Sequence, residues 1–269
     1  MLPCCKMFNS RKYDAVSEQR FKIGDFLRKL AEVRSGDDVL DVGCTTGELT
    51  VKLAYLAYPG RVLGIDTSPE MLTVALRKAR ANSIPNIAFL LGDIRELNFT
   101  GEFDLVFSSF LLEWVWDQQT VLEKLLRSLR RGGRLALQLM AKDFCPPLLA
   151  ALDKVIAEII PNCPYKGGNY PWFLGEEEIY GMLVEAAGFT GIEVCRQEWP
   201  LRFTSAEAAV AFFRVADLLP YLALLPEAAQ MTFCHRLAEE LAAQCGPGEF
   251  ELPYDRLFVI ARKPRLGKV

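Results

Sequence analysis

The chain has 269 residues, of which 51% are hydrophobic and 24% are charged, and its formal net charge at pH 7 is −3. A chain of this size and composition can bury one large hydrophobic core. The small negative net charge argues against a nucleic-acid-binding protein, because such proteins carry clustered positive charge. One histidine and eight cysteines, none in a C-x-x-C pair, argue against a zinc site, and no metal is expected.

No apolar run in the sequence approaches the length needed to span a membrane, so no membrane partner is expected. No signal-peptide pattern is found either. We therefore expect a cytoplasmic protein whose cysteines stay reduced.

The most informative segment begins with an apolar run, Val39-Leu40-Asp41-Val42. The run breaks into a turn with Gly43, Thr45 and Gly47, and a helical pattern then covers residues 49–57. This order predicts the first strand, the cofactor loop and the first helix of a nucleotide-binding α/β domain.

A second apolar run ends in Asp66. An acidic residue at about twenty residues from the loop suits a ribose, whose two hydroxyls need acceptors. Ser68 and Pro69 begin the next helix well, because serine can cap a helix N-terminus and proline fits the first helical position.

The loop distinguishes two classes of cofactor. A dinucleotide-binding turn needs three glycines, so that the pyrophosphate can lie against the backbone. Here the turn has only Gly43 and Gly47, and the strand before it carries Asp41, which would repel a pyrophosphate. The same carboxylate can hold the ammonium group of an amino acid, directly or through water. The loop therefore predicts S-adenosylmethionine.

Three further strands are predicted, at residues 87–91, 103–107 and 134–140. After the first of them, Asp93 can accept a hydrogen bond from an adenine amino group and Ile94 can pack on the ring. A helix is expected over residues 118–129, ended by Gly132 and Gly133. Strands that alternate with helices predict a mostly parallel sheet.

Together these segments, over residues 35–140, resemble the class I S-adenosylmethionine-dependent methyltransferases. Thr45 stands where that family usually has its middle glycine, a position that tolerates small residues. The resemblance implies a doubly wound, mostly parallel, seven-stranded sheet of the Rossmann-like type with a helical cap. The cofactor-binding residues that we expect are Asp41, Gly43, Thr45, Gly47, Asp66, Thr67, Met71, Asp93, Ile94 and Ser109.

We expect a single domain with three parts. Residues 1–34 form an N-terminal lid segment, a polar lead followed by an amphipathic helix over residues 21–33. Residues 35–142 form the cofactor-binding core, and residues 143–269 complete the sheet and add helical cap insertions. Within the last part, residues 143–175 hold five prolines and three glycines, which predicts a functional lid because an ordinary connection is shorter.

The remaining elements follow the same logic. A helix is expected over residues 176–187 with Gly188 as its C-terminal cap, and a strand or hairpin arm over residues 191–203. Residues 204–245 are helical and apolar, and residues 252–263 form the last strand. This helical insertion is expected over the carboxyl ends of the strands, where ligands bind in such sheets.

The residues expected to bind the methyl acceptor are assigned from a looser similarity. The chain carries, in order, Tyr13, Ser17-Glu18-Gln19, Glu113-Trp114-Val115-x-Asp117, a long cap and Tyr254-x-x-Leu-Phe-Val-Ile-Ala-Arg-Lys. This order is similar to that of small-molecule carboxylate methyltransferases, nearest to the juvenile hormone acid and trans-aconitate groups. The resemblance implies that Gln19 and Trp114 orient the carboxylate of the acceptor.

Glu113 departs from that pattern, because the residue before the tryptophan is usually histidine or glutamine in these groups. An ionised Glu113 that faces the pocket would repel a carboxylate, and it would instead attract an amine or act as a base for a hydroxyl. If Glu113 points away from the pocket, the carboxylate interpretation stands. The sequence leaves both orientations open.

We therefore expect a methyltransferase that acts on a small, partly apolar molecule at a carboxylate oxygen, with Gln19, Trp114 and Glu113 as the catalytic candidates. A carboxylate needs no general base, which agrees with the single histidine, His235. Two alternatives stay open: an N- or hydroxyl-O-methyltransferase that uses Glu113, and a regulatory protein that binds S-adenosylmethionine without turnover. A dehydrogenase is less favoured than either.

Overall fold

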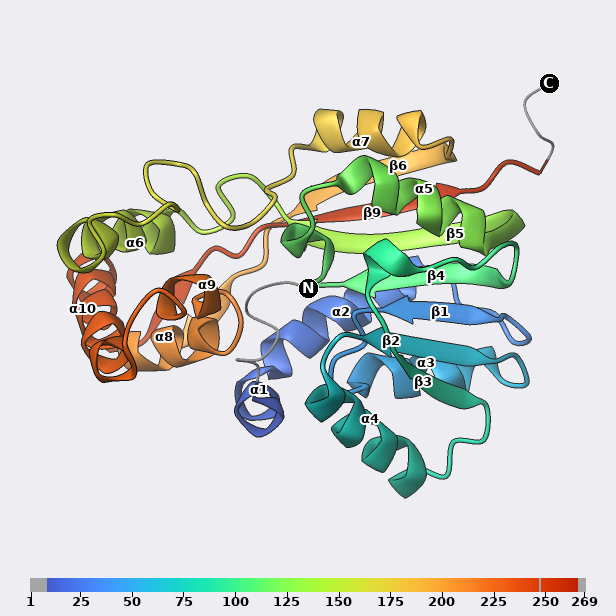
Figure 1. The fold of residues 1–269 in the computed structure, drawn as a ribbon, viewed down its shortest axis with the longest axis horizontal. Helices are drawn as coiled ribbons and strands as arrows, with labels where there is room; N and C mark the ends of the chain where they lie inside the picture. The colour runs from blue at the N-terminus through green and yellow to red at the C-terminus, as the bar shows by residue number, and fades with distance from the viewer. Residues whose placement is uncertain (1–8, 247, 266–269) are drawn as a thin grey trace.

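The computed structural model describes residues 9–246 and 248–265 of the chain. Within them, seven strands form one sheet in the order β3-β2-β1-β4-β5-β9-β6, as Figure 1 shows. These strands are β1 (Val39–Val42), β2 (Val62–Asp66), β3 (Ile87–Leu91), β4 (Phe103–Ser109), β5 (Leu129–Met140), β6 (Thr190–Gln197) and β9 (Arg256–Arg262). Strand β9 pairs antiparallel with both β5 and β6, while β1 to β5 pair in parallel. The expected mostly parallel, seven-stranded sheet is confirmed.

Helices cover both faces of this sheet. Consecutive residues of a strand point to opposite faces, so each strand contributes side chains to both. Val39 and Phe107 join one buried cluster with side chains of the helices α2 and α3, while Leu40 and Val106 join a second cluster with side chains of α5 and α7. The core helices are α2 (Glu18–Leu30), α3 (Glu48–Ala57), α4 (Pro69–Ala81), α5 (Gln118–Ser128) and α7 (Glu177–Ala186). The sheet is therefore doubly wound.

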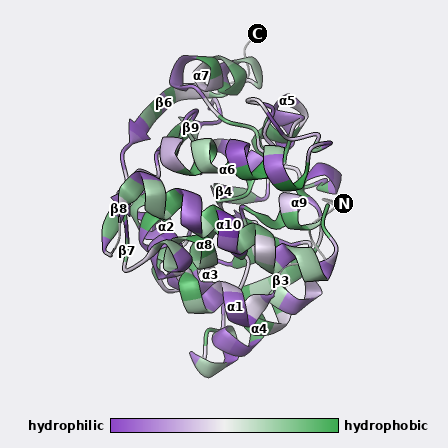
Figure 2. Cartoon of the chain, turned by 90° about the vertical axis from the view of Figure 1, so that its left-hand side faces the viewer, coloured by the Kyte–Doolittle hydropathy of each residue, from purple (hydrophilic) through white to green (hydrophobic). Residues whose placement is uncertain are grey.

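A helical cap lies beyond the carboxyl end of β5, on the left of Figure 1 and nearest the viewer in Figure 2. Its elements are α6 (Pro146–Ile159), β7 (Leu201–Phe203), α8 (Ala206–Arg214), α9 (Leu219–Leu222), α10 (Glu227–Cys245) and β8 (Phe250–Leu252). Cap side chains such as Leu152 and Phe213 belong to the same buried cluster as Trp114 and Met140 of the core. The cap and the sheet therefore share one hydrophobic core at the strand ends.

Two expectations near the N-terminus need correction. The polar lead contains a helix, α1 (Ser10–Val16), whose first turn is capped by Asn9. Helix α2 begins at Glu18 instead of residue 21. The first eight residues of the expected lid segment lie outside the described part of the chain.

The segment 143–175, expected to be a long connection that serves as a lid, contains helix α6 over residues 146–159. Its role as a lid stays a prediction. Pro146 and Pro147 stand in the first turn of that helix, where proline is well tolerated. Leu148, Leu152 and Val155 of α6 are fully buried in the shared core. The prolines therefore mark the start of a packed helix instead of a loop.

Gly132 and Gly133 do not end the helix before them. Helix α5 stops at Ser128 and strand β5 begins at once with Leu129, so both glycines lie within the strand. The pairing of β4 with β5 shifts register across this stretch, and Gly132 has a φ of +76°. A bulge needs a residue that tolerates a positive φ, so the two glycines permit the bulge in β5 and do not cap α5. By contrast, Gly188 follows α7 with a φ of +101°, and its predicted role as a cap is confirmed.

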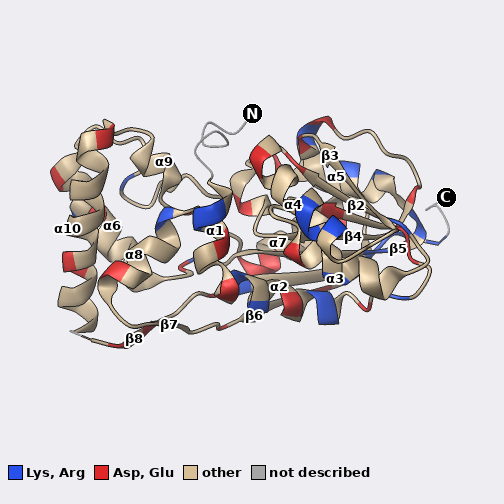
Figure 3. Ribbon diagram, turned by 90° about the horizontal axis from the view of Figure 1, so that it is seen from below, with Lys and Arg blue, Asp and Glu red and all other residues tan. Residues whose placement is uncertain are grey.

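Among the described residues, no helix combines the length and the apolar character needed to cross a membrane. The same residues hold no cluster of three or more His, Cys, Asp or Glu side chains suited to a metal ion. Figure 3 shows Lys and Arg interspersed with Asp and Glu over the core elements.

Gly47 provides a test of the loop geometry. Its φ is +76°, and an added Cβ would lie 2.7 Å from the Cβ of Ala75. Gly101 has a similar φ of +64° with nothing within 4 Å. We expect Gly101→Ala to cost about 1 kcal/mol from backbone strain alone, and Gly47→Ala at least about 2 kcal/mol because a close contact is added. Urea unfolding without cofactor measures both, and equal losses would contradict the account.

Candidate active site

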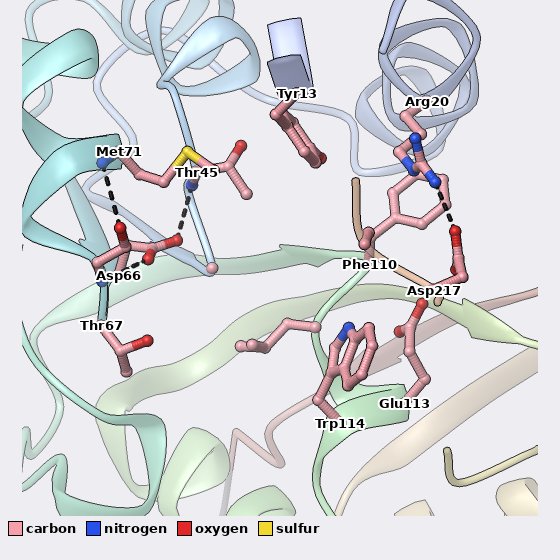
Figure 4. A pocket seen from close by; sticks show the side chains of 14 residues that line it. Tyr13, Arg20, Thr45, Asp66, Thr67, Met71, Phe110, Glu113, Trp114 and Asp217 are labelled. Atoms are coloured by element: carbon pink, nitrogen blue, oxygen red, sulfur yellow. Dashed lines mark hydrogen bonds and ion pairs between the residues drawn. The ribbon is translucent and has the colours of Figure 1, made fainter. Parts of the chain in front are cut away.

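A cavity lies where the carboxyl ends of β1, β2 and β4 meet the cap, and Figure 4 shows its wall. Its lining residues are Tyr13, Arg20, Gly43, Thr45, Asp66, Thr67, Ser68, Met71, Phe110, Leu111, Glu113, Trp114, Ala216 and Asp217. The loop residues after β1 and β2 lie on one side, and the residues that follow β4 face them together with Arg20 and Asp217. We call the first side the cofactor half and the second side the acceptor half, after the roles that the sequence predicts for their residues.

In the cofactor half, Asp66 is held by the backbone of its neighbours. Its Oδ2 accepts a hydrogen bond of 3.0 Å from the Thr45 N–H, and its Oδ1 accepts one of 2.8 Å from the Ser68 N–H. Burial raises the pKa of the Asp66 carboxyl above its ordinary value, and these N–H groups oppose that shift. The Thr67 N–H is a third backbone partner of this carboxylate. A carboxylate has about four acceptor positions, so acceptor capacity remains for a ribose hydroxyl.

Thr45 and Gly43 give the loop its shape. Thr45 has a φ of +48° and Gly43 one of +80°, and the N–H groups of Gly43 and Cys44 both donate to the Ile65 carbonyl. This turn fastens the end of β1 to β2 and directs the Thr45 N–H at Asp66. Threonine thus takes the left-handed conformation that the family's usual glycine adopts more easily.

Asp41 lies deeper, in a smaller cavity that adjoins the first and also contains Ser109. Its Oδ2 accepts a hydrogen bond of 2.7 Å from the Thr50 hydroxyl. Burial raises the pKa of Asp41 to about 7, with a contribution from the charge of Asp66. Arg20 also lines this smaller cavity, but no ion pair to Asp41 is found among the described residues. A buried carboxylate without an ion-pair partner fits the ammonium group of the methionine end of the cofactor.

Most of the residues that the sequence singles out line these two cavities. The larger cavity contains Gly43, Thr45, Asp66, Thr67, Met71, Glu113 and Trp114, and the smaller one adds Asp41 and Ser109. Gly47, Asp93, Ile94 and Gln19 line neither. Gly47 contributes through its missing side chain, which lets the loop approach Ala75.

The Asp93 carboxylate accepts from the Arg95 N–H and forms an ion pair of 2.5 Å with the Arg95 guanidinium. It thereby caps a short 3₁₀ helix, Ile94–Glu96, and Ile94 is buried in the core beside that turn. The adenine contacts of Asp93 and Ile94 stay predictions.

In the N-terminal segment the structure brings Arg20 to the cavity in place of Gln19. The buried face of α2 consists of Arg20, Ile23, Gly24 and Leu27, which recur at helical spacing. Gln19 lies one position off that face and is half-buried. The missed signal was a cation standing in the apolar stripe of an amphipathic helix.

Arg20 is 2% exposed, and its Nη2 lies 2.6 Å from Oδ2 of Asp217 in the cap. The same Nη2 donates to the Phe212 carbonyl, and the guanidinium carbon lies 3.8 Å from the centroid of the Phe212 ring. Its Nη1 is buried without a hydrogen-bond partner among the described residues. A buried guanidinium with an unused donor is suited to an anionic ligand.

Glu113, whose orientation the sequence left open, lines the cavity and is paired. Its Oε1 accepts a hydrogen bond of 2.7 Å from Nη2 of Arg256, and both side chains are almost completely buried. Arg256 donates to Gln138 through Nε, and Gln138 donates to the Ser109 hydroxyl. Burial raises the pKa of Glu113, while the Arg256 guanidinium opposes this shift. The negative charge of Glu113 is therefore balanced by the guanidinium of Arg256.

This fold, with an aspartate on each of its first two strands at the edge of the cavity, is that of an S-adenosylmethionine-dependent methyltransferase. Residues 33–188 match a family model described as a methyltransferase domain, and the chain belongs to that family. The family match extends past residue 142, and the division of the chain at residues 34 and 142 stays a prediction.

The chain is 30% identical to the trans-aconitate 2-methyltransferase of Deinococcus radiodurans over 263 residues, which cover 96% of this chain and 99% of that protein. It is 28% identical to the enzyme of the same name from an Escherichia coli O7:K1 strain, over 84% of this chain and 86% of the relative.

Among solved structures, the chain is similar to phosphoethanolamine N-methyltransferase 2 of Haemonchus contortus in complex with S-adenosyl-L-methionine. The TM-score is 0.61 at 17% identity, over 95% of this chain and 56% of that one. A putative methyltransferase of Bacillus halodurans matches with a TM-score of 0.61 at 16% identity, over 90% and 99% of the two chains. At these identities the likeness concerns the fold alone.

Two substitutions test the division of the cavity. Asp66→Ala is expected to weaken S-adenosylmethionine binding about 100-fold, because two charge-assisted hydrogen bonds are lost, and Asp66→Asn about tenfold. Trp114→Ala is expected to leave the affinity for the cofactor within about twofold and to lower turnover, with Trp114→Phe as the control that keeps an aromatic wall. Calorimetric titration and methyl-transfer assays measure the two effects. Equal loss of cofactor affinity in both alanine variants would refute the division.

The raised pKa of Asp41 predicts a pH dependence. The ammonium group of the cofactor is held by the ionised carboxylate, so S-adenosylhomocysteine should bind about tenfold more weakly at pH 6 than at pH 8, given a pKa of about 7. Asp41→Asn should flatten this profile and serves as the control for titration of the ligand. Without ligand, the effect of pH on the stability of the fold has the opposite sign. Between about pH 4 and pH 7 the folded protein keeps a proton on Asp41 that the unfolded chain has released. The stability that Asp41 contributes therefore falls as the pH rises through this range. A flat calorimetric profile in the native protein would contradict this role.

Proposed function

We propose that this enzyme transfers the methyl group of S-adenosylmethionine to a carboxylate oxygen of a small, partly apolar molecule. The observation that carries the proposal is Arg20, a buried cation with an unused N–H donor, in the wall that also contains Trp114. A guanidinium in such a site attracts a carboxylate strongly, because little water screens the interaction. The relatives named trans-aconitate 2-methyltransferases support the same class of acceptor, since trans-aconitate is a carboxylic acid.

Apart from Tyr13, Glu113 and Asp217, the rest of the acceptor half is apolar. Phe110, Leu111, Trp114 and Ala216 line it, and Phe110 stacks on Tyr254 with ring centroids 6.2 Å apart. Walls of this kind bury hydrocarbon and exclude water. They support an acceptor whose carboxylate meets Arg20 while an apolar portion lies against the aromatic rings.

For this reaction the main task of the protein is to position the acceptor relative to the methyl group. Bound S-adenosylmethionine supplies an electrophilic methyl group on sulfur. The acceptor carboxylate is ionised at neutral pH and attacks without a general base. Arg20 and Trp114 would hold the carboxylate in line with that methyl group, and the apolar wall would keep water out.

Gln19, which the sequence put forward for the orienting role, lies outside the cavity wall, and we assign that role to Arg20. Asp217 keeps the Arg20 side chain extended along the wall through their 2.6 Å ion pair. The Nη1 group of Arg20 is buried without a partner among the described residues, and we assign it to the carboxylate of the acceptor.

A second candidate is methyl transfer to an amine or a hydroxyl, with Glu113 as partner or base. It is favoured by one observation: Oε2 of Glu113 is buried without a partner among the described residues, in a residue that lines the cavity. Against it, Oε1 is already engaged by Arg256 at 2.7 Å. The alternative of a non-catalytic cofactor-binding protein is not carried further, because the family and the relatives are methyltransferases.

The test is transfer of a labelled methyl group to a panel of carboxylic acids, phenols and amines, followed by mild base. We expect label to be released as volatile methanol, which marks a methyl ester. Base-stable label would identify an ether or an amine product and would overturn the proposal in favour of the Glu113 alternative.

Substitutions separate the two candidates further. Arg20→Met combined with Asp217→Asn removes the cation without leaving a buried carboxylate unpaired, and it should lower kcat/KM for the acid about 100-fold or more while cofactor affinity is kept. Glu113→Gln keeps an acceptor for Arg256 and should retain methyl-ester formation. Loss of all transfer in Glu113→Gln, with full activity in the double variant, would favour Glu113 as the base. Thermal unfolding with and without cofactor checks that each variant is folded.

A further inference from the structure

We infer that the cavity selects acids with a single carboxylate, and that Asp217 and Glu113 are the residues that set this limit. The inference rests on the proposed carboxylate methylation and narrows its substrate class. It concerns how many negative charges the acceptor can bring into the cavity, a property that neither the fold nor the family determines.

The first step is the balance of charge in the cavity wall. Two guanidinium groups lie at or behind the acceptor half, and each already has its own buried carboxylate. Arg20 lies 2.6 Å from Asp217, with side chains 2% and 3% exposed, and Arg256 lies 2.7 Å from Glu113, with side chains 0% and 1% exposed. Within the described part of the chain, the positive charge at the acceptor end is therefore fully matched before any acceptor enters.

The second step is the number of donors that remain. Arg20 and Arg256 each keep one buried Nη1 without a partner among the described residues, but only Arg20 belongs to the cavity wall. The guanidinium carbon of Arg256 lies 4.2 Å from the centroid of the Phe110 ring, and Phe110 lines the cavity while Arg256 does not. One carboxylate can thus reach a charged donor directly.

The third step is the cost of further carboxylates. The remainder of the acceptor wall is formed by Tyr13, Phe110, Leu111, Trp114 and Ala216, which offer no cation. A second or third ionised carboxylate would lie against these side chains, close to the carboxylates of Glu113 and Asp217. Burial of an unpaired charge near charges of the same sign is strongly unfavourable. A hydrocarbon chain or ring in the same place is favourable.

The experiment compares acids of similar size in the native enzyme. The probes are hexanoic acid and phenylacetic acid, with one carboxylate each, and propane-1,2,3-tricarboxylic acid, with three. Methyl-ester formation from labelled S-adenosylmethionine gives kcat/KM for each. We expect the better monocarboxylic acid to exceed the tricarboxylic acid by about 100-fold or more, because two unpaired carboxylates would be buried.

Two substitutions then test the cause. Asp217→Asn and Glu113→Gln each keep a hydrogen-bond acceptor for the paired arginine and remove its countercharge. The double variant therefore leaves two uncompensated guanidinium groups at the acceptor end. It should shift the ratio of kcat/KM values at least about tenfold toward the tricarboxylic acid, an effect that general destabilisation would not produce. Glu178→Gln, at an exposed position on α7 outside the cavity, changes the net charge of the chain in the same direction and should leave the ratio unchanged.

The outcomes are distinct. Equal or better use of the tricarboxylic acid by the native enzyme would overturn the inference and leave the proposed carboxylate methylation intact. An unchanged ratio in the double variant would show that Asp217 and Glu113 do not set the limit. Failure to form a methyl ester with any acid, with transfer to an amine or phenol, would overturn the proposed function and the inference with it.

Discussion

The ion pair between Arg20 and Asp217 joins three parts of this molecule. Arg20 comes from the second helix of the chain and Asp217 from the cap, 197 positions later. The Tyr254 hydroxyl, just before the last core strand, also donates to Asp217, at 3.4 Å. Removing two charges from water is unfavourable unless they meet each other, so the N-terminal segment and the cap must come together in this one arrangement. The wall of the cavity is a direct result of that requirement.

A second pair of buried, opposite charges, Glu113 and Arg256, follows the same constraint. Glu113 follows the fourth strand and is matched by Arg256 of the last sheet strand, which is in turn held by Gln138 of the strand between them. A buried carboxylate that the sequence presents as a possible base is thereby committed to a structural partner. The cavity consequently offers a largely apolar surface, and Arg20 is the one guanidinium among its described lining residues.

The sequence predicted the position of the loop and of the acidic residues beside it, because these signals are local. An apolar run, a turn with Gly43 and Gly47 and an acidic residue after the next strand are enough to place Thr45 and Asp66 at one edge of a parallel sheet. In the acceptor half, the sequence singled out Glu113 and Trp114, which follow a strand closely and both line the cavity. Gln19 was one position away from the residue that reaches the cavity, and Asp217 was not considered, because nothing near it in the chain reveals its partner. The same limit explains Gly132, a strand bulge, and Pro146, a helix start, since the meaning of both residues depends on their neighbours in space.

This division between local and long-range signals bears on what similarity can establish. The strand, loop and helix that bind the cofactor are short and self-contained, so one fold serves methyltransferases with different acceptors. The acceptor wall, in contrast, is assembled from α2, the segment after β4 and the cap, which meet only in the folded chain. A single change from a carboxylate to an amide at Asp217 or Glu113 would alter the charge of that wall and leave the fold and the cofactor loop as they are. The identity of the acceptor therefore has to be argued from the pairing of these buried charges.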